Sequence, residues 1–377
     1  MIKVTNRLYA PPKALPQYLA NADKSLYFDI ETTGLSPRNS FIYMIGAAFR
    51  NDPDNDYTCV QWLAESITNE AEVIEEFLEL ASGYDTLIHY NGTTFDIPFI
   101  TKRAELYDIN FDPASMQSID IYKRVIKYRN ILCFNDYKQK TVENRMKYPR
   151  KDTLSGKELI DIYKKFSDSK DEEFKNLLFL HNHDDIEGML SITPILSLCS
   201  MLRNHEYVLD SVNIHEHKSL NDSTSHELMI KGTFSNMTHV SSTSNITHGS
   251  SEDNTFFSFN ENRILFKIPI FIGELKTYYK DYKNYYYYPT EDMAVHKSVA
   301  IYTDSDYREK ASPENCYTRF AGAFIPLWKD CFTPVFRADY QSEDLYLTLT
   351  DEMMNDKTAL KDYCDHIIDT IITRKHT

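Results

Sequence analysis

The stretch Phe28-Asp29-Ile30-Glu31-Thr32-Thr33-Gly34 decides how the first half of this chain is interpreted. Residues 25–30 are apolar, aromatic and β-branched and run into turn-forming residues, which is typical of a buried strand. Because side chains alternate along a strand, Asp29 and Glu31 point to the same face, about 7 Å apart. Two carboxylates this close repel each other unless a cation or a proton lies between them. Mg²⁺ prefers oxygen ligands of this kind, although a lone Asp-x-Glu pair is common by chance in an acidic chain.

Further strand-like and helix-like segments alternate after this stretch. Their patterns predict strands over 41–49, 57–63, 86–90 and 118–121, helices over 69–81 and 96–106, and mostly helical segments up to about residue 204. Three strands before the first long helix indicate a meander, and the later strands alternate with helices. This order predicts an α/β fold, a mixed β-sheet with helices packed on it.

Two more groups of polar residues follow. Asp96 comes after the turn Tyr90-Asn91-Gly92-Thr93-Thr94-Phe95, at a helix N-terminus where an acid is favoured electrostatically, so a plain helix cap is the alternative. His181 and Asp185 lie four residues apart on a predicted helix and therefore share one face, for which a solvated polar face is the alternative.

Taken together, D-x-E, N-x4-D and H-x3-D resemble the three exonuclease motifs of the DEDD nucleases, which belong to the ribonuclease H-like superfamily. The resemblance is closest to the YprB-like predicted exonuclease branch and covers about residues 20–200. It extends to Lys140-Thr141-Val142-Glu143, Arg150-Lys151-Asp152 and Ser155-Gly156. It implies a ribonuclease H-like mixed sheet flanked by helices and a 3′–5′ exonuclease that hydrolyses phosphodiester bonds of DNA or RNA. By the same resemblance two divalent cations, Mg²⁺ or Mn²⁺, are held by four carboxylates: Asp29, Glu31, Asp96 and Asp185.

The departure from the family pattern is at position 181. Family members usually carry Tyr at this position, or His one residue earlier, where this chain has Leu180. We hypothesise that His181 acts as general base or orients the nucleophilic water, with His183 as a less favoured substitute. The alternative is that His181 only packs or forms a hydrogen bond. Asp184 is a possible replacement for Asp185 as ligand, but the spacing favours Asp185. Asp120 is interpreted as a structural acid at a sheet end.

A basic segment lies between the second and third motifs. From Lys123 to Lys157 there are eleven Lys and Arg against three acids, a local charge of +8 in a chain of −15. The tyrosines within it, 122, 128, 137 and 148, could stack on bases while the cations contact phosphates, and a solvated helical face is the alternative. The expected partner is an end of single-stranded DNA or RNA. The predicted substrate contacts are Asn91, which alternatively only holds its turn, together with Thr32, Lys147 and Arg150.

The composition changes near residue 205, which predicts two domains: 1–204, an exonuclease domain, and 205–377, a smaller α+β domain of unknown function. Residues 211–255 are rich in Ser, Thr, Asn and His, which favours loops and short surface hairpins. Beyond them the sequence predicts a hairpin over 255–272 and a helix over 357–372. The tyrosine cluster at 278–288 is interpreted as a half-buried β-surface, with a base-stacking platform as the alternative.

Composition and charge narrow the class of protein. The 377 residues are 42% hydrophobic and 26% charged, an ordinary globular composition. The chain contains no run of about 18 apolar residues, no signal-peptide pattern and no Cys-x-x-Cys pair among six cysteines, so we expect a cytoplasmic protein without a membrane span or disulfides. Two alternatives to the nuclease stay open: a non-catalytic nucleic-acid-binding module and a phosphoesterase acting on small nucleotides.

Overall fold

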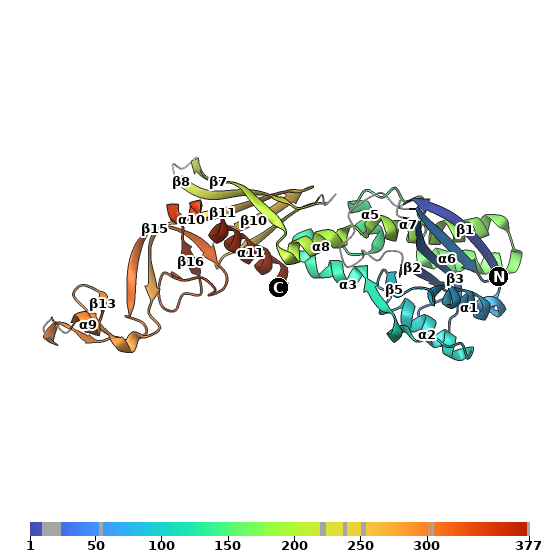
Figure 1. Cartoon of the computed structure of the whole chain (residues 1–377), viewed down its shortest axis with the longest axis horizontal. Coiled ribbons are helices and arrows are strands. Elements are labelled where there is room, and N and C mark those ends of the chain that lie inside the picture. Colours follow the sequence, from blue (N-terminus) through green and yellow to red (C-terminus); the bar gives the residue numbers. More distant parts are fainter. Residues whose placement is uncertain are drawn as a thin grey trace. The chain divides into compact units, whose positions relative to one another are not determined.

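The structure is a computed structural model (Figure 1), and it describes residues 1–9, 24–52, 56–218, 224–236, 240–249, 254–300, 302 and 305–374. The chain divides into two compact units. The first consists mainly of Met1–Arg129 and Cys133–Asn204, and the second of His205–Met237 and Ser241–Thr377 together with Asn130–Leu132.

A six-stranded mixed sheet forms the centre of the first unit. In spatial order its strands are β1 (Ile2–Tyr9), β4 (Asp56–Leu63), β3 (Ile42–Asp52), β2 (Ser25–Thr32), β5 (Thr86–His89) and β6 (Gln117–Asp120). The first four pair antiparallel, whereas β2, β5 and β6 pair parallel. The carboxyl ends of β2 and β5 therefore meet at one edge of the sheet, where Asp29, Glu31 and the turn before Asp96 lie.

Helices cover both faces of this sheet (Figure 1). On one face α1 (Glu70–Ala81) and α2 (Asp96–Leu106) share a core with the alternate residues of β2, Leu26, Phe28 and Ile30. On the other face α6 (Gly156–Ser169) and α7 (Glu172–Ile192) pack on β3 and β4, with Tyr163 of α6 stacked on Tyr43 of β3. The predicted mixed sheet flanked by helices is confirmed.

Shorter elements link these layers. They are η3 (Ile67–Asn69), η4 (Pro113–Ser115), α3 (Ile121–Val125), η5 (Ile126–Tyr128), α4 (Arg129–Leu132), α5 (Gln139–Arg145) and α8 (Ile195–Asn204). Strand β1 has no counterpart in the sequence prediction. Most of its residues are polar and it pairs only with β4, so it carries little of the apolar signal that identifies a buried strand.

The helical stretch Glu172–Asn204, which contains α7 and α8, is long and apolar enough to cross a membrane by length and composition alone. Because 67% of its most apolar window is buried inside the protein, we interpret it as core helix of the first unit.

Antiparallel strands dominate the second unit. Its larger sheet contains β7 (Tyr207–Lys218), β8 (Thr224–Phe234), β9 (Ser241–Thr247), β10 (Asn254–Asn260), β11 (Arg263–Tyr278), β15 (Tyr317–Leu327) and β16 (Leu345–Thr348). A three-stranded sheet contains β12 (Tyr285–Tyr288), β13 (Met293–His296) and β14 (Glu309–Lys310). The remaining elements are η6 (Tyr282–Asn284), α9 (Lys297–Ala300), η7 (Ser305–Tyr307), α10 (Asp351–Asn355) and α11 (Lys357–Thr373). The hairpin and the C-terminal helix expected from the sequence correspond to β10–β11 and α11.

The expectation of loops and short hairpins over 211–255 is wrong for most of the described part of that range, although 219–223, 237–239 and 250–253 lie outside the described residues. β7, β8 and β9 are full members of the larger sheet. β9 buries small hydroxyl side chains: Ser242 donates to the carbonyl of Ile131 at 2.7 Å and Ser244 to that of Phe257 at 3.2 Å. Satisfied hydroxyls can be buried without an apolar run, so the composition misled the prediction.

Candidate active site

Strand β2 presents two carboxylates on the face opposite its apolar core residues. Asn182 of α7 donates from Nδ2 to Asp29 Oδ2 at 3.4 Å. The Tyr43 hydroxyl of β3 donates to Glu31 Oε2 at 3.4 Å. The period of two along β2 therefore places Asp29 and Glu31 toward α7, as the sequence predicts.

Asp96 begins α2 and reaches back to β2. Its Oδ1 accepts a hydrogen bond from the backbone N–H of Ile30 at 3.3 Å, between the two carboxylates of the strand. The turn before it depends on Asn91, which has a φ of 63°, a left-handed conformation that Asn tolerates. Asp120 accepts the backbone N–H groups of Asn91 and Thr93 at 3.0 and 3.3 Å. It is thus the structural acid that the sequence suggests.

Helix α7 supplies the third group. His181 Nε2 lies 3.0 Å from Asp185 Oδ2, one turn further along the helix, and 3.3 Å from Glu31 Oε1. Its other nitrogen, Nδ1, lies 2.7 Å from Asp152 Oδ2. His181 therefore bridges the strand carboxylate, the helix carboxylate and a buried acid from the loop before α6.

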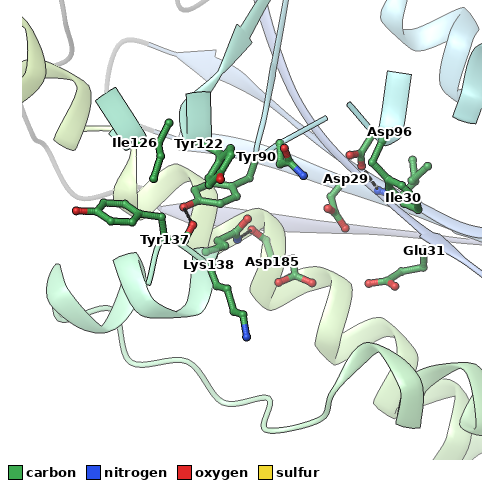
Figure 2. Close-up of a pocket in the computed structure, with 13 residues that line it drawn as sticks. Asp29, Ile30, Glu31, Tyr90, Asp96, Tyr122, Ile126, Tyr137, Lys138 and Asp185 are labelled. Atoms are coloured by element: carbon green, nitrogen blue, oxygen red, sulfur yellow. Dashed lines mark hydrogen bonds between the residues drawn. The ribbon is translucent and has the colours of Figure 1, made fainter. Parts of the chain in front are cut away.

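The four carboxylates Asp29, Glu31, Asp96 and Asp185 line one cavity of about 620 Å³. Figure 2 shows Asp29, Glu31, Asp96 and Asp185 toward one end and a group of aromatic side chains, Tyr90, Tyr122 and Tyr137, toward the other. The remaining lining residues are Ile30, Asn91, Phe95, Ile126, Lys138 and Gln139.

Burial and mutual repulsion act on the carboxyl groups. Burial, followed by the charges of Asp185 and Asp96, raises the pKa of Asp29 well above its ordinary value. Burial also raises the pKa of Glu31 to about 7, although His181 opposes it. For Asp96, burial raises the pKa to about 7 against two backbone hydrogen bonds. Carboxylates that are this costly to ionise together favour the binding of a cation between them.

Two side-chain cations already lie against Asp185. Arg150 Nη2 is 2.7 Å from Asp185 Oδ1. Burial opposes ionisation of Asp185, but the hydrogen bond from His181 and the charges of His181 and Arg150 hold its pKa below the ordinary value. Burial lowers the pKa of His181, yet Asp185, Glu31 and Asp152 outweigh it and raise the pKa to about 9. These three carboxylates favour the protonated imidazole of His181, which donates hydrogen bonds, whereas metal charge beside it would favour the neutral form, which can offer Nε2 as a ligand.

The donor set fits a divalent cation. Glu31, His181 and Asp185 each offer one ligand atom, and these atoms lie within 4.8 Å of one another. Asp29 and Asp96 line the same cavity. A set dominated by carboxylate oxygens suits hard cations such as Mg²⁺ and Mn²⁺.

The neighbours of His181 and Asp185 on α7 face elsewhere. Asp184 is fully buried, and its Oδ2 accepts the backbone N–H groups of Lys151 and Asp152 at 2.7 and 2.6 Å. His183 lies near Glu187, with Nδ1 and Oε2 3.9 Å apart, whereas His181 lies against Glu31 and Asp185. The geometry thus favours Asp185 over Asp184 and His181 over His183.

The residues predicted to contact substrate are placed differently from one another. Asn91 lines the cavity. Thr32 donates its hydroxyl to the carbonyl of Gly34 at 2.9 Å, and Lys147 is exposed outside the cavity lining. Arg150 is engaged with three acids, Glu143 and Asp152 in addition to Asp185.

The four tyrosines of the basic segment differ in whether they line the cavity. Tyr122 and Tyr137 line the cavity. Tyr128 is buried, at 9% exposure, and Tyr148 donates its hydroxyl to Glu187 at 2.8 Å. Only the first two are placed to meet a ligand in this cavity.

Sequence reasoning missed the role of several residues behind the site. Asp152 anchors His181, and Asn182 connects Asp29 to Gln61, whose Nε2 donates to Asn182 Oδ1 at 2.9 Å. The only signal for Asp152 is its place in Arg150-Lys151-Asp152, one of the stretches that resembles the nuclease family. Asn182 lies between two noted histidines, but nothing in the pattern indicates a buried amide.

Comparisons with known proteins agree with this fold. Residues 26–197 match the family model described as the RNase_H superfamily, so the first unit contains an RNase H-like domain. Over 48 residues, 13% of this chain, the sequence is 38% identical to a DNA polymerase of Methanocaldococcus jannaschii.

Two solved structures are also similar to this chain. The family B DNA polymerase of Pyrobaculum calidifontis has a TM-score of 0.36 at 15% identity over 47% of this chain. The E. coli ExoI–ssDNA complex in its zinc-bound form has a TM-score of 0.28 at 9% identity over 55%. This chain spans 3% of the M. jannaschii polymerase and 26% and 54% of the two solved chains.

Proposed function

We propose that this chain is a metal-dependent nuclease of the DEDD type, a 3′–5′ exonuclease that removes nucleotides from an end of single-stranded DNA or RNA. One observation carries the proposal: acids from β2, α2 and α7, far apart in the sequence, line a single cavity, where burial and the charges of Asp185 and Asp96 raise the pKa of Asp29. The RNase_H superfamily match and the resemblance of the three motifs to the DEDD nucleases support it.

Asp29, Glu31, Asp96 and Asp185 would hold two divalent cations, Mg²⁺ or Mn²⁺. Such a pair supplies an activated water and stabilises the attacking and leaving oxygens of an in-line displacement at phosphorus. Asp29, Glu31 and Asp96, whose pKa values are raised, suit this task because a bound cation offsets both the repulsion between the carboxylates and the cost of burying their charge.

The chain's own groups would position the reactants. The imidazole of His181, fixed by Asp152 at Nδ1, directs Nε2 toward the carboxylates, where it can orient the nucleophilic water. Metal charge in the site would lower the pKa of His181, and the neutral imidazole could then also accept a proton from the water. Tyr122 and Tyr137 offer ring faces to the terminal bases, and Lys138 and Asn91 lie where phosphate or sugar groups would enter.

The test is degradation of 5′-labelled single-stranded DNA and RNA with Mg²⁺, Mn²⁺ or EDTA. We expect a metal-dependent ladder of shortened labelled products, absent with EDTA and absent in Asp29→Ala. The matched control is Asp161→Asn, which changes an acid exposed on α6 and should retain activity.

Three outcomes would contradict the proposal. A ladder that persists in Asp29→Ala would show that another site or a contaminant cleaves. Oligonucleotide binding without cleavage would favour a non-catalytic binding module. Faster hydrolysis of a mononucleotide ester than of an oligonucleotide would favour a phosphoesterase.

A further inference from the structure

A second cavity, of about 340 Å³, lies in the first unit between the α3–η5 segment and α8. We call it the basic pocket. It is lined by Arg124, Lys127, Tyr128, Leu196, Cys199, Ser200 and Arg203. Three of these seven side chains are cationic and none is acidic, in a chain whose net charge is −15. The lining therefore favours an anion.

Two of the three cations at the pocket, Lys127 and Arg203, are available to a ligand. Lys127 and Arg203 are exposed, and neither forms an ion pair within the described residues. The Arg203 Nε donates to the neutral Asn204 Oδ1 at 3.4 Å. Arg124 and Arg203 line the pocket together with Cys199, from α3 and α8 respectively.

The basic pocket shares a wall with the candidate active site. The α3–η5 segment turns Tyr122 and Ile126, four residues apart, toward the active-site cavity. The same segment turns Arg124 and Lys127 toward the basic pocket. A polynucleotide whose end lies against Tyr122 would therefore reach the basic pocket by crossing this one segment.

We propose that the basic pocket binds a phosphodiester group of the polynucleotide whose end occupies the candidate active site; this rests on the proposed nuclease function. Guanidinium groups bind phosphate oxygens through paired N–H donors, Lys127 adds a point charge, and the Ser200 hydroxyl is a further donor. Affinity at this pocket would therefore depend on the length of the strand and not on the identity of its terminal nucleotide.

The experiment measures binding of labelled single strands of two, four, eight and sixteen nucleotides to the full-length protein in EDTA, by fluorescence anisotropy. The variant is Lys127→Gln with Arg203→Gln. The control is Lys102→Gln with Lys164→Gln, which removes the same charge from α2 and α6. Lys127, Lys164 and Arg203 are exposed and Lys102 is partly exposed, and circular dichroism checks that each protein is folded.

We expect the basic-pocket variant to lose about tenfold in affinity for the sixteen-mer and almost nothing for the dinucleotide, while the control changes neither. Its salt dependence should become shallower, the slope of log K against log salt falling by about 1.4 for two lost contacts. Metal-dependent hydrolysis of a dinucleotide should be unchanged.

Equal losses in variant and control, or no length dependence, would overturn the proposal. Inorganic phosphate and a nucleoside monophosphate are added as competitors. If either binds wild type but not the variant and leaves the sixteen-mer's affinity unchanged, the pocket is a site for a free phosphate and the polynucleotide assignment fails. Length-dependent binding without cleavage would refute the proposed nuclease function but support the proposed role of the basic pocket. Cleavage by wild type, together with unchanged oligonucleotide affinity in the Lys127→Gln, Arg203→Gln variant, would refute only the role of the pocket.

Discussion

At the scale of single residues, the site depends on one chain of contacts behind its carboxylates. Asp184 accepts the backbone N–H of Asp152, and Asp152 in turn holds Nδ1 of His181. Asp152 is buried, and Lys140 and Arg150 also reach its carboxylate. Its position is thus fixed from several sides, and so is the ring that it orients. Such outer partners set the direction of a side chain without touching the reactants.

Replacing Asp152 with Asn tests this role. The amide removes the charge that orients His181, so we expect kcat for metal-dependent cleavage to fall roughly 10- to 100-fold with KM nearly unchanged. Steady-state kinetics on a labelled oligonucleotide measure both constants. Asp161→Asn is the control, and a melting temperature close to wild type separates positioning from unfolding. An unchanged kcat would mean that Asp152 only supports the loop.

At the scale of elements, the close approach of α7 to β3 brings the side chains of α7 next to the carboxylates of β2. Gly46 of β3 lies opposite Asp29 in the ladder. A Cβ at Gly46 would lie 2.1 Å from Oδ1 of Asn182, the buried amide that donates to Asp29. Glycine is therefore required there by space rather than by backbone conformation, and it lets the helix carry His181 and Asp185 close to the strand.

Gly46→Ala should destabilise the first unit. The added methyl group would push Asn182 away from Gln61 and Asp29, and overpacking of this kind costs about 1–3 kcal/mol. Gly156→Ala is the matched control: a Cβ there meets nothing within 4 Å, at the first position of α6, so we expect a change below about 0.5 kcal/mol. Urea unfolding of both variants measures the difference. Equal stability of the two would show that α7 can shift at no cost.

Much of the first unit could be predicted from local patterns, because each of its central strands and helices has a clear apolar period. The alternation along β2 places Asp29 and Glu31 on one face, and the helical period of α7 places His181 with Asp185. These are short-range regularities, and the structure retains them. β9 lacks such a period because the buried Ser242 and Ser244 replace apolar side chains, and most of β7 is exposed, so the composition of this range suggested loops.

The parts of the candidate site that sequence could not give are long-range. From the sequence, Arg150 is predicted to contact a phosphate because it lies in a basic segment. In the structure it forms ion pairs with Asp185, Glu143 and Asp152. Nothing in the spacing shows that a loop between α5 and α6 returns to α7. The charge of a side chain can be read from sequence, but the acid that it faces depends on the tertiary fold.

At the scale of the whole molecule, the two units have separate cores and each contains one of the two tryptophans, Trp62 and Trp328. His366 of α11 lies in the second unit, where its Nε2 accepts the backbone N–H of Trp328 at 3.3 Å. Burial, with help from Lys329, lowers the pKa of His366 to about 4. Because the unfolded chain binds this proton near its ordinary pKa of about 6.5, acid favours unfolding of this unit.

We therefore expect the free energy of unfolding of the second unit to be highest above pH 6.5 and to fall between pH 6.5 and 4. His366→Gln, which keeps an acceptor but cannot be protonated, should reduce that fall by up to about 2 kcal/mol. Trp328 fluorescence during urea unfolding, in a Trp62→Phe background, reports this unit. His248 is also buried with a lowered pKa, so some pH dependence should remain. An identical pH profile for the variant would exclude His366 as its source.

Charge is distributed unevenly over the molecule, and this bears on how a polyanion would bind it. The chain carries −15 in total, whereas the segment from Lys123 to Lys157 carries +8. Some cations of this segment form ion pairs with acids: Arg150 with three acids and Lys140 with Asp152. Exposed cations remain near the cavity, among them Lys123, Lys127 and Lys138. Salt weakens the few contacts between these lysines and the phosphates of a bound strand. The acidic remainder of the surface repels the strand.

Binding of single-stranded oligonucleotide should therefore weaken steeply with salt. About four phosphate contacts would reduce affinity roughly 50-fold between 50 and 200 mM salt. Anisotropy titrations in EDTA at several salt concentrations measure the slope, and the Lys102→Gln, Lys164→Gln protein provides the control for charges elsewhere. A flat profile would mean that the exposed cations form a solvated face and that stacking on Tyr122 and Tyr137 holds the strand, because stacking on a neutral ring releases no counterions.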